Sequence, residues 1–277
     1  MKIQLVVDSA ADLPQSFVEE NQIEVVPLNV QFGDETFADG TQLSTGQFYE
    51  KMAESEHLPV TSLPSPQAFA DAFQKVKDKG PILCITISAA TSGTYQSALV
   101  AKEMFDHPIE VIDSLRISMG AGLQVMKAQE LINQGLTLEE VKREVLKNRN
   151  NYHTFIAIYD LKNVIKGGRI SNWKGNLAQF LNIKPILNLF PDGTINIVAN
   201  IRGRKKQLEK VLELIRNTKK DLSKVPFVIL HAQAPKEELD ALIREIKARF
   251  NPKDIILGEL GPIMGSHGGF RSIGVAF

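Results

Sequence analysis

Residues 81–98 read PILCITISAATSGTYQSA, and this stretch decides the fold. Residues 82–87 are almost wholly apolar, which predicts a strand buried on both faces, as in the middle of a parallel sheet. The glycine and hydroxyl residues that follow lead into a helical pattern from about residue 93 to 105. Cys84 is the single cysteine of the chain and falls in this strand, so we expect it to be a small core residue.

The rest of the first half continues this alternation of strand and helix. Apolar runs predict strands at residues 3–7, 23–30 and 109–112, and helical spacing predicts helices at residues 66–77, 122–133 and 138–148. Alternating strands and helices predict a parallel sheet with helices on both faces. We assign this α/β domain to residues 1–150.

The second half, residues 151–277, has a different pattern. Pro191-Asp192-Gly193 lies between apolar runs at residues 185–190 and 194–198, which predicts a β-hairpin and therefore antiparallel pairing. Further strands are predicted at residues 155–159, 227–230, 255–257 and 273–277, and helices at residues 204–218 and 235–250. This half is thus predicted to be a second α/β domain with its own sheet, and the charged residues 142–151 mark the boundary.

The charges of the chain balance, with 32 Lys and Arg against 32 Asp and Glu. A chain without a basic excess has no overall attraction to nucleic acid, so we expect a small molecule or a protein as its partner. The N-terminus reaches an acid at Asp8, too early for a signal peptide, and no apolar stretch approaches the length of a membrane span. The expected location is the cytoplasm, which leaves room for transient contact with a membrane.

Hydroxyl side chains in two segments are candidates for ligand binding. Thr61 and Ser62 lie upstream of Ser65, which precedes a proline and fits a helix N-cap. Ser92 follows the buried strand, at the strand end where open α/β sheets bind ligands. The amides of a helix N-terminus favour an anion there, but a capping role for Ser92 or Thr94 fits the sequence equally well.

Two further segments combine glycines with a cation or an imidazole. Arg169 follows two glycines and could bind a carboxylate or phosphate, although a solvated turn is also typical of such a segment. The basic run that begins at Arg202 is open to the same two interpretations. His267 lies among glycines in a predicted loop at residues 261–269, where a packed core histidine is not expected. Of the five histidines it is the best candidate for contact with a ligand.

Known motifs for nucleotides, metals and hydrolases are missing from the sequence. There is no Gly-x-Gly-x-x-Gly after a strand, no Walker lysine, no metal-ligand spacing and no Gly-x-Ser-x-Gly elbow. We therefore expect neither a cofactor nor a metal, and binding is favoured over catalysis. A hydrolase that uses Ser92 with His267 remains the alternative, although no orienting acid can be assigned to it.

Taken together, these segments resemble the DegV family of fatty-acid-binding proteins nearly end to end. The matching motifs are residues 8–9, 61–65 (TSLPS), 92–98 (SGTYQSA), 113–114, 118–120, 167–171 (GGRIS), 184–187 (KPIL) and the C-terminal Gly/His region. The resemblance implies an N-terminal α/β/α layer with a parallel sheet and a C-terminal two-layer α/β domain with a mixed sheet. It also implies one long-chain fatty acid bound between them.

The resemblance implies roles for individual residues. The fatty-acid carboxylate would be held by the hydroxyls and the imidazole of Thr61, Ser62, Ser92 and His267. Some family members present the bound acid to a separate ATP-dependent fatty acid kinase, which makes acyl phosphate for phospholipid metabolism. The chain is accordingly expected to be a lipid-binding protein and not an enzyme by itself. Arg169, Arg202 and Arg271 would face the phosphate or the kinase.

The C-terminal segment departs from the family pattern. Residues 266–274 read SHGGFRSIG, where the family usually has a Gly-Pro-Gly turn and small apolar residues. Phe270 and Arg271 are therefore unexpected, and Arg271 is a candidate to direct its charge at the headgroup. A third interpretation, an interaction module that carries lipid incidentally, predicts that emptying the pocket leaves partner binding unchanged.

Overall fold

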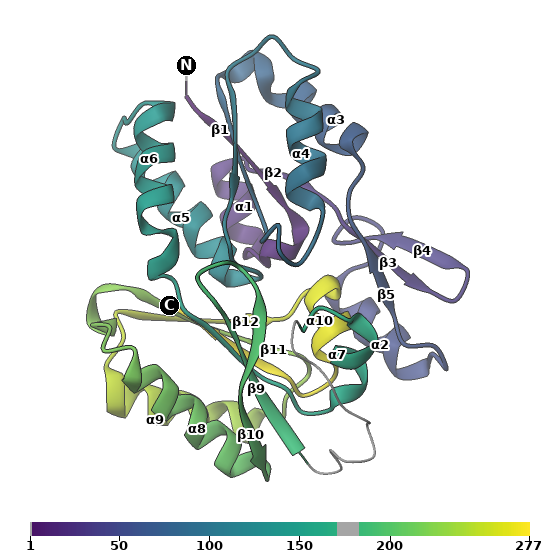
Figure 1. Ribbon diagram of the computed structural model, residues 1–277, viewed down its shortest axis with the longest axis vertical. Coiled ribbons are helices and arrows are strands. Elements are labelled where there is room, and N and C mark those ends of the chain that lie inside the picture. Colours follow the sequence, from purple (N-terminus) through teal and green to yellow (C-terminus); the bar gives the residue numbers. More distant parts are fainter. Residues whose placement is uncertain (1, 171–182) are drawn as a thin grey trace. The chain divides into compact units, whose positions relative to one another are not determined.

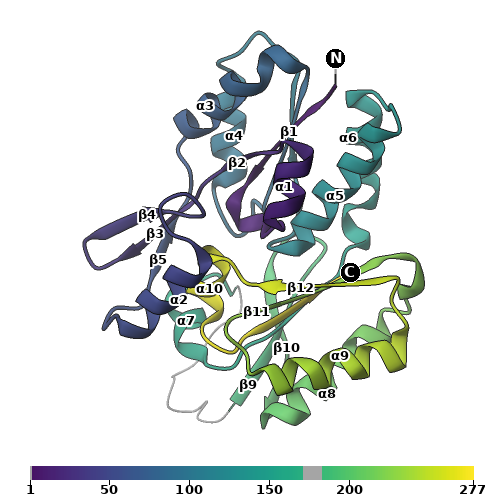
Figure 2. The same ribbon diagram turned by 180° about the vertical axis from the view of Figure 1, so that it is seen from behind.

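The computed structural model describes residues 2–170 and 183–277, and these form two compact units (Figures 1 and 2). The first unit comprises Met1–Tyr152, Pro191–Thr194 and Gly261–Ile263, and the second comprises His153–Phe190, Ile195–Leu260 and Met264–Phe277. Among the described helices, none is both long and apolar enough to cross a membrane.

The first unit is built on a four-stranded parallel sheet in the order β2-β1-β6-β7. The strands are β1 (Gln4–Asp8), β2 (Glu24–Val26), β6 (Ile82–Thr86) and β7 (Ile109–Asp113). All five residues of β6 are buried, and Cys84 is a buried free thiol. The sequence prediction of a central buried strand with a core cysteine is therefore confirmed.

Helices pack on both faces of this sheet, α3 and α4 on one and α5 and α6 on the other (Figures 1 and 2). The helices of the unit are α1 (Gln15–Asn21), α2 (Thr45–Glu54), α3 (Pro66–Val76), α4 (Thr94–Lys102), α5 (Met119–Asn133) and α6 (Leu138–Asn148). Phe69 and Phe73 of α3 are completely buried and join Val6 and Cys84 in one apolar cluster. Three short 3-10 helices, η1 (Ser9–Ala11), η2 (Lys77–Lys79) and η3 (Arg149–Asn151), complete the unit.

The predicted single strand at residues 23–30 is wrong, because two strands in different sheets occupy it. β2 ends at Val26, Pro27 follows, and β3 (Asn29–Phe32) belongs to a small antiparallel sheet in the order β4-β3-β5. Its other strands are β4 (Glu35–Ala38) and β5 (Val60–Ser62). Proline lacks an N–H and cannot continue a ladder, which explains the break.

The second unit is a six-stranded mixed sheet in the order β10-β9-β8-β13-β11-β12. The strands are β8 (Thr154–Ala157), β9 (Ile183–Leu189), β10 (Ile195–Arg202), β11 (Pro226–His231), β12 (Asp254–Glu259) and β13 (Ile273–Ala276). The helices are α7 (Leu161–Gly167), α8 (Arg204–Asn217), α9 (Lys236–Phe250) and α10 (Pro262–Gly268), with a 3-10 helix η5 (Leu222–Lys224). The predicted hairpin is confirmed as the antiparallel pair β9 and β10.

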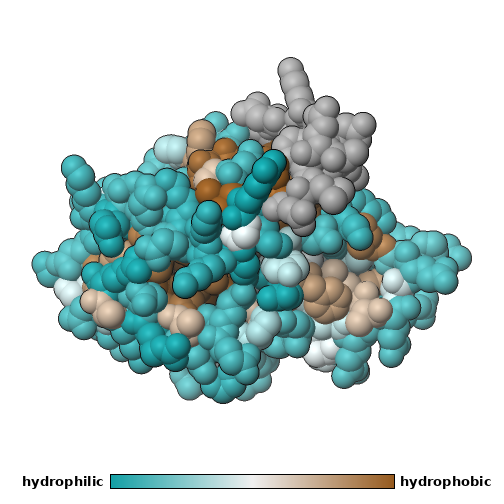
Figure 3. All heavy atoms as spheres, turned by 90° about the horizontal axis from the view of Figure 1, so that it is seen from below, coloured by the Kyte–Doolittle hydropathy of each residue, from teal (hydrophilic) through white to brown (hydrophobic). Residues whose placement is uncertain are grey.

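The core of the second unit lies between its sheet and the pair α8 and α9, which run along one face (Figures 1 and 2). Val211 and Ile215 of α8 and Leu242 and Ile246 of α9 bury their side chains there. The opposite sides of these helices are charged, and the surface seen from below is mostly hydrophilic, with apolar side chains in small groups (Figure 3). The fold class predicted from the sequence, α/β with one parallel and one mixed sheet, is confirmed.

Candidate functional site

The first candidate pair, Thr61 and Ser62, lies at the end of β5, an edge strand of the small sheet. Thr61 pairs with Val30 and Ser62 with Asn29 of β3, so the backbone of this hydroxyl pair is fixed by a ladder. Ser65 is the N-cap of α3, and its hydroxyl accepts from the Ala68 N–H at 3.2 Å. The predicted capping role of Ser65 is confirmed, and Thr61 and Ser62 stand outside it.

Ser92 lies one residue before the N-cap of α4, which is Gly93. Gly93 has no side chain to cap the helix, but the Ser92 Oγ accepts from the Thr94 N–H, the first amide of α4, at 3.4 Å, so Ser92 takes part of the capping role expected for it. The Ser92 Oγ lies 2.8 Å from the Thr94 Oγ1, which makes a pair of hydroxyls at the helix N-terminus. A helix N-terminus also favours an anion, because its first backbone amides have no acceptor within the helix.

The two hydroxyl segments meet in the first unit. A Cβ built on Gly93 would lie 3.1 Å from the Leu63 Cδ2, tighter than almost all real contacts. Leu63 follows directly on Ser62, and Gly93 follows directly on Ser92. The fold therefore brings together segments 30 residues apart in the sequence, and glycine at position 93 allows their close approach.

His267 lies in α10, so the predicted loop at residues 261–269 is wrong over residues 262–268, which are helical. The imidazole packs directly against Gly167, the last residue of α7, where any Cβ would collide with the His267 Nδ1. Burial, with a smaller contribution from the charge of Arg169, lowers the pKa of His267 to about 4. Its imidazole is therefore neutral at pH 7, and it is more closely packed than the glycine-rich sequence indicates.

The three candidate arginines occupy different surroundings. The Arg169 Nη1 donates to the Gly167 carbonyl at 2.6 Å. Arg169 is thus held at the end of α7, near enough to His267 for its charge to lower the pKa of the imidazole. Arg202 is exposed at the end of β10, where it pairs with Ile183. Arg271 contacts Tyr159 and Glu238 within the second unit. Ser171, the last residue of the GGRIS motif, lies outside the described residues.

Three carboxyl groups in the first unit form a cluster that sequence analysis missed. Burial raises the pKa of Asp8 to about 7 and that of Asp12 to about 8, and it also raises the pKa of Asp39 to about 6. Asp12 accepts from the Ser118 Oγ at 2.5 Å and from the Gly261 N–H at 3.1 Å. Asp8 lies in a motif named from the sequence and Asp12 follows it four residues later, whereas Asp39 comes from a separate segment directly after β4.

Comparisons with known proteins agree along the whole chain. The sequence model of the DegV family, described as an uncharacterised protein family, matches residues 2–277. A DegV domain-containing protein of Clostridium acetobutylicum is 34% identical over 100% of this chain and 98% of its own length.

Solved structures match over the same extent. A DegV family protein of Thermus thermophilus, described by its fatty acid binding, has a TM-score of 0.91 at 30% identity and covers 100% of this chain and 99% of its own. A stearic-acid-binding protein of Eubacterium ventriosum has a TM-score of 0.87 at 26% identity and covers 99% and 97%.

Proposed function

The chain belongs to the DegV family, and from this premise we propose that it binds one long-chain fatty acid and presents the carboxylate to a separate ATP-dependent fatty acid kinase. The observation that carries the proposal is the end-to-end match to DegV proteins described as binding fatty acids. The local geometry of the candidate residues is compatible with this role and gives it a chemical rationale.

The carboxylate ligands in this proposal are Thr61, Ser62, Ser92 and His267. Hydroxyls and a neutral imidazole N–H can each donate a hydrogen bond to a carboxylate oxygen without adding a full positive charge. The low pKa of His267 keeps the imidazole neutral at pH 7. A carboxylate held in this way retains its nucleophilic character, which phosphoryl transfer from ATP requires.

The affinity in this proposal comes from the acyl chain. Burying apolar surface contributes about 0.8 kcal/mol per methylene group, so a long chain can supply most of the binding free energy. The polar residues then orient the headgroup. Arg169 and Arg202 are proposed to face the phosphate or the kinase. Phosphoryl transfer is assigned to the kinase, and the chain itself acts as a lipid-binding protein.

The proposal is tested by native mass spectrometry of the purified protein, followed by organic extraction of the bound molecule. We expect one fatty acid per chain, and acyl phosphate only after a kinase and ATP are added. A protein that is purified empty and takes up no added fatty acid of any length would overturn the proposal. Turnover of activated esters that Ser92→Ala abolishes would instead support the hydrolase alternative.

Variants at the hydroxyls test the ligand assignment. Ser92→Ala removes one donor to the carboxylate, and we expect oleate to bind about tenfold more weakly, as for loss of one hydrogen bond to a charged group. Ser44→Ala is the matched control, because Ser44 caps α2 and its loss affects only helix stability. Equal weakening in both variants would remove Ser92 from the site.

A further inference from the structure

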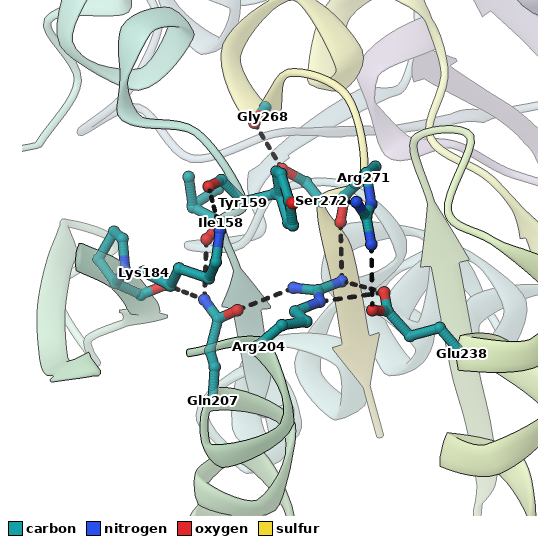
Figure 4. Close-up of polar contacts among 10 residues, drawn as sticks. Ile158, Tyr159, Lys184, Arg204, Gln207, Glu238, Gly268, Arg271 and Ser272 are labelled. Atoms are coloured by element: carbon teal, nitrogen blue, oxygen red, sulfur yellow. Dashed lines mark hydrogen bonds and ion pairs between the residues drawn. The ribbon is translucent and has the colours of Figure 1, made fainter. Parts of the chain in front are cut away.

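A network of charged side chains surrounds Tyr159 in the second unit (Figure 4). The Arg271 Nη1 donates to the Tyr159 hydroxyl at 2.9 Å, and its guanidinium carbon lies 4.1 Å from the ring centroid. Glu238 of α9 pairs with Arg204 at 2.7 Å and with Arg271 at 3.6 Å. Arg204 and Glu238 are nearly buried, with side chains 11% and 14% exposed, so solvent screens their pairing only weakly.

The same network fixes the backbone that follows α10. The Arg271 N–H donates to the Ala232 carbonyl at 2.5 Å, and the Arg271 carbonyl accepts from the Arg204 Nη2 at 2.8 Å. The Ser272 Oγ donates to the Gly268 carbonyl at 2.5 Å. Both sides of the turn after His267 are thus tied, one to α8 and the other to the last turn of α10.

Arg271 also connects α10 with α7, the helix against which His267 packs. Tyr159 directly precedes Asp160, the N-cap of α7. Asn163 in the middle of α7 donates to the Ser266 carbonyl at 3.0 Å, and Gly167 at its end contacts the His267 imidazole. The orientation of α7 relative to α10 therefore depends on contacts along the whole of α7, of which the Arg271–Tyr159 contact is the first.

Arg271 has a backbone conformation that is unusual for a residue with a side chain. Its φ is +61°, in the left-handed region where glycine is unstrained and an arginine is not. Its donors are directed inward, to Tyr159 and Glu238, and those of Arg204 are used by Glu238, Gln207 and the Arg271 carbonyl. Most donors of the two guanidinium groups therefore orient protein groups, whereas the Arg271 Nε has no hydrogen-bond partner among the described residues.

We propose that Arg271 is a positioning residue for His267, because it holds the segment that follows α10 against Tyr159, which precedes α7, and against Glu238 of α9. The proposal rests on the proposed function, because it assigns to His267 a role in holding the carboxylate. Arg271 does not contact the fatty acid in this proposal. It fixes the surface of α7 on which the imidazole rests, and so the direction in which the imidazole N–H points.

Arg271→Gly is the test, because glycine fits the backbone conformation and removes only the side chain. Glu238 keeps its pairing with Arg204, so no charge is left alone and the fold is expected to survive. Two measurements are made: the dissociation constant for oleate, and the NMR titration of the His267 imidazole. We expect about tenfold weaker binding, equivalent to about 1.4 kcal/mol, and a pKa of His267 that moves up toward its ordinary value.

Two further variants make the result decisive. Tyr159→Phe keeps the ring and removes only the hydroxyl, so a smaller change in the same direction is expected. Arg249→Ala is the control, because it breaks ion pairs with Glu209 and Glu245 on the exposed sides of α8 and α9, and neither measurement should change.

The possible outcomes separate this inference from the proposed function. Unchanged oleate binding and an unchanged His267 titration in Arg271→Gly would overturn the positioning role. A wild-type protein that binds no fatty acid would overturn the proposed function, and the imidazole titration would still decide the role of Arg271. Equal effects of Arg249→Ala and Arg271→Gly would show a general loss of stability and also overturn the positioning role.

Discussion

Gly167→Ala is the substitution for which the structure gives the sharpest expectation. Gly167 ends α7, and an added Cβ would lie 3.2 Å from the His267 Cε1 and still closer to its Nδ1. The imidazole ring cannot stay where it is when that methyl group is present. Because His267 is part of α10 and its imidazole packs on α7, we expect its displacement to disturb the contact between these two helices.

Two opposing effects set the magnitude. Replacing glycine by alanine in a helix normally stabilises a protein by about 0.4–1 kcal/mol. Overpacking a closely packed contact costs about 1–3 kcal/mol. The collision therefore outweighs the gain in helix propensity, and we expect a net loss of about 1 kcal/mol. The sign of the change is the informative result, because propensity alone predicts the opposite one.

Urea unfolding measures this difference, and Gly46→Ala is its matched control. Gly46 lies in α2, is exposed and has open space where the Cβ would be, so this variant should gain about 0.5 kcal/mol. The His267 resonances should shift in Gly167→Ala and stay unchanged in the control. A Gly167→Ala protein that is as stable as Gly46→Ala, with an unperturbed imidazole, would refute the packing of His267 on α7.

Three further predictions concern stability. Folding disfavours the protonated form of His267, so lowering the pH from 6.5 toward 4 should reduce the free energy of unfolding by up to about 3 kcal/mol. Urea unfolding midpoints measured over this pH range should fall less in His267→Gln than in the wild type. Raising the pH toward 8 should destabilise the protein through Asp12, whose pKa is raised to about 8, because the charged form is disfavoured in the fold. Asp12→Asn cannot ionise, and its Oδ1 can accept from the Gly261 N–H while its Nδ2 donates to the Ser118 Oγ. Its unfolding free energy should therefore vary less between pH 6 and 8; an equally steep profile would contradict this. Thr137→Ala removes the capping box of α6 and should cost about 1 kcal/mol, measured as a lower thermal midpoint.

Sequence patterns correctly predicted the helices, strands and turns that are determined by residues close together in the sequence. The helix at residues 138–148 was predicted with its observed bounds, Leu138–Asn148, and the capping box of Thr137 with Glu140 defines its start. The central strand was predicted because residues 82–87 are almost wholly apolar. In the structure every residue of β6 is buried. The hairpin was predicted because Asp192-Gly193 supplies the turn chemistry that joins β9 and β10.

The missed features depend on contacts between distant segments. α10 contains two glycines in seven residues, which argues against a helix by propensity, yet its packing partners make it one. The network of Tyr159, Glu238 and Arg271 joins residues from three segments that share no spacing, and Glu238 reads in the sequence as part of a solvated helix face. His267 was named as a candidate from its glycine-rich surroundings, whereas its contact with Gly167 joins two distant segments and has no pattern in the sequence.

Two glycines, Gly167 at the end of α7 and Gly269 directly after α10, allow the close packing around His267 that lowers the pKa of its imidazole. Gly167 of α7 lies against the imidazole of His267. Gly269 lies close to Asn163 of α7, since a Cβ built on Gly269 would be 2.9 Å from the Asn163 Oδ1. Thus a glycine of α7 contacts a polar side chain of α10, and a glycine directly after α10 contacts a polar side chain of α7. This reciprocal approach removes water from around the imidazole, and desolvation is the main cause of its lowered pKa. We expect a larger residue at either position to push the two segments apart and admit water, which would move the pKa of His267 up toward its ordinary value.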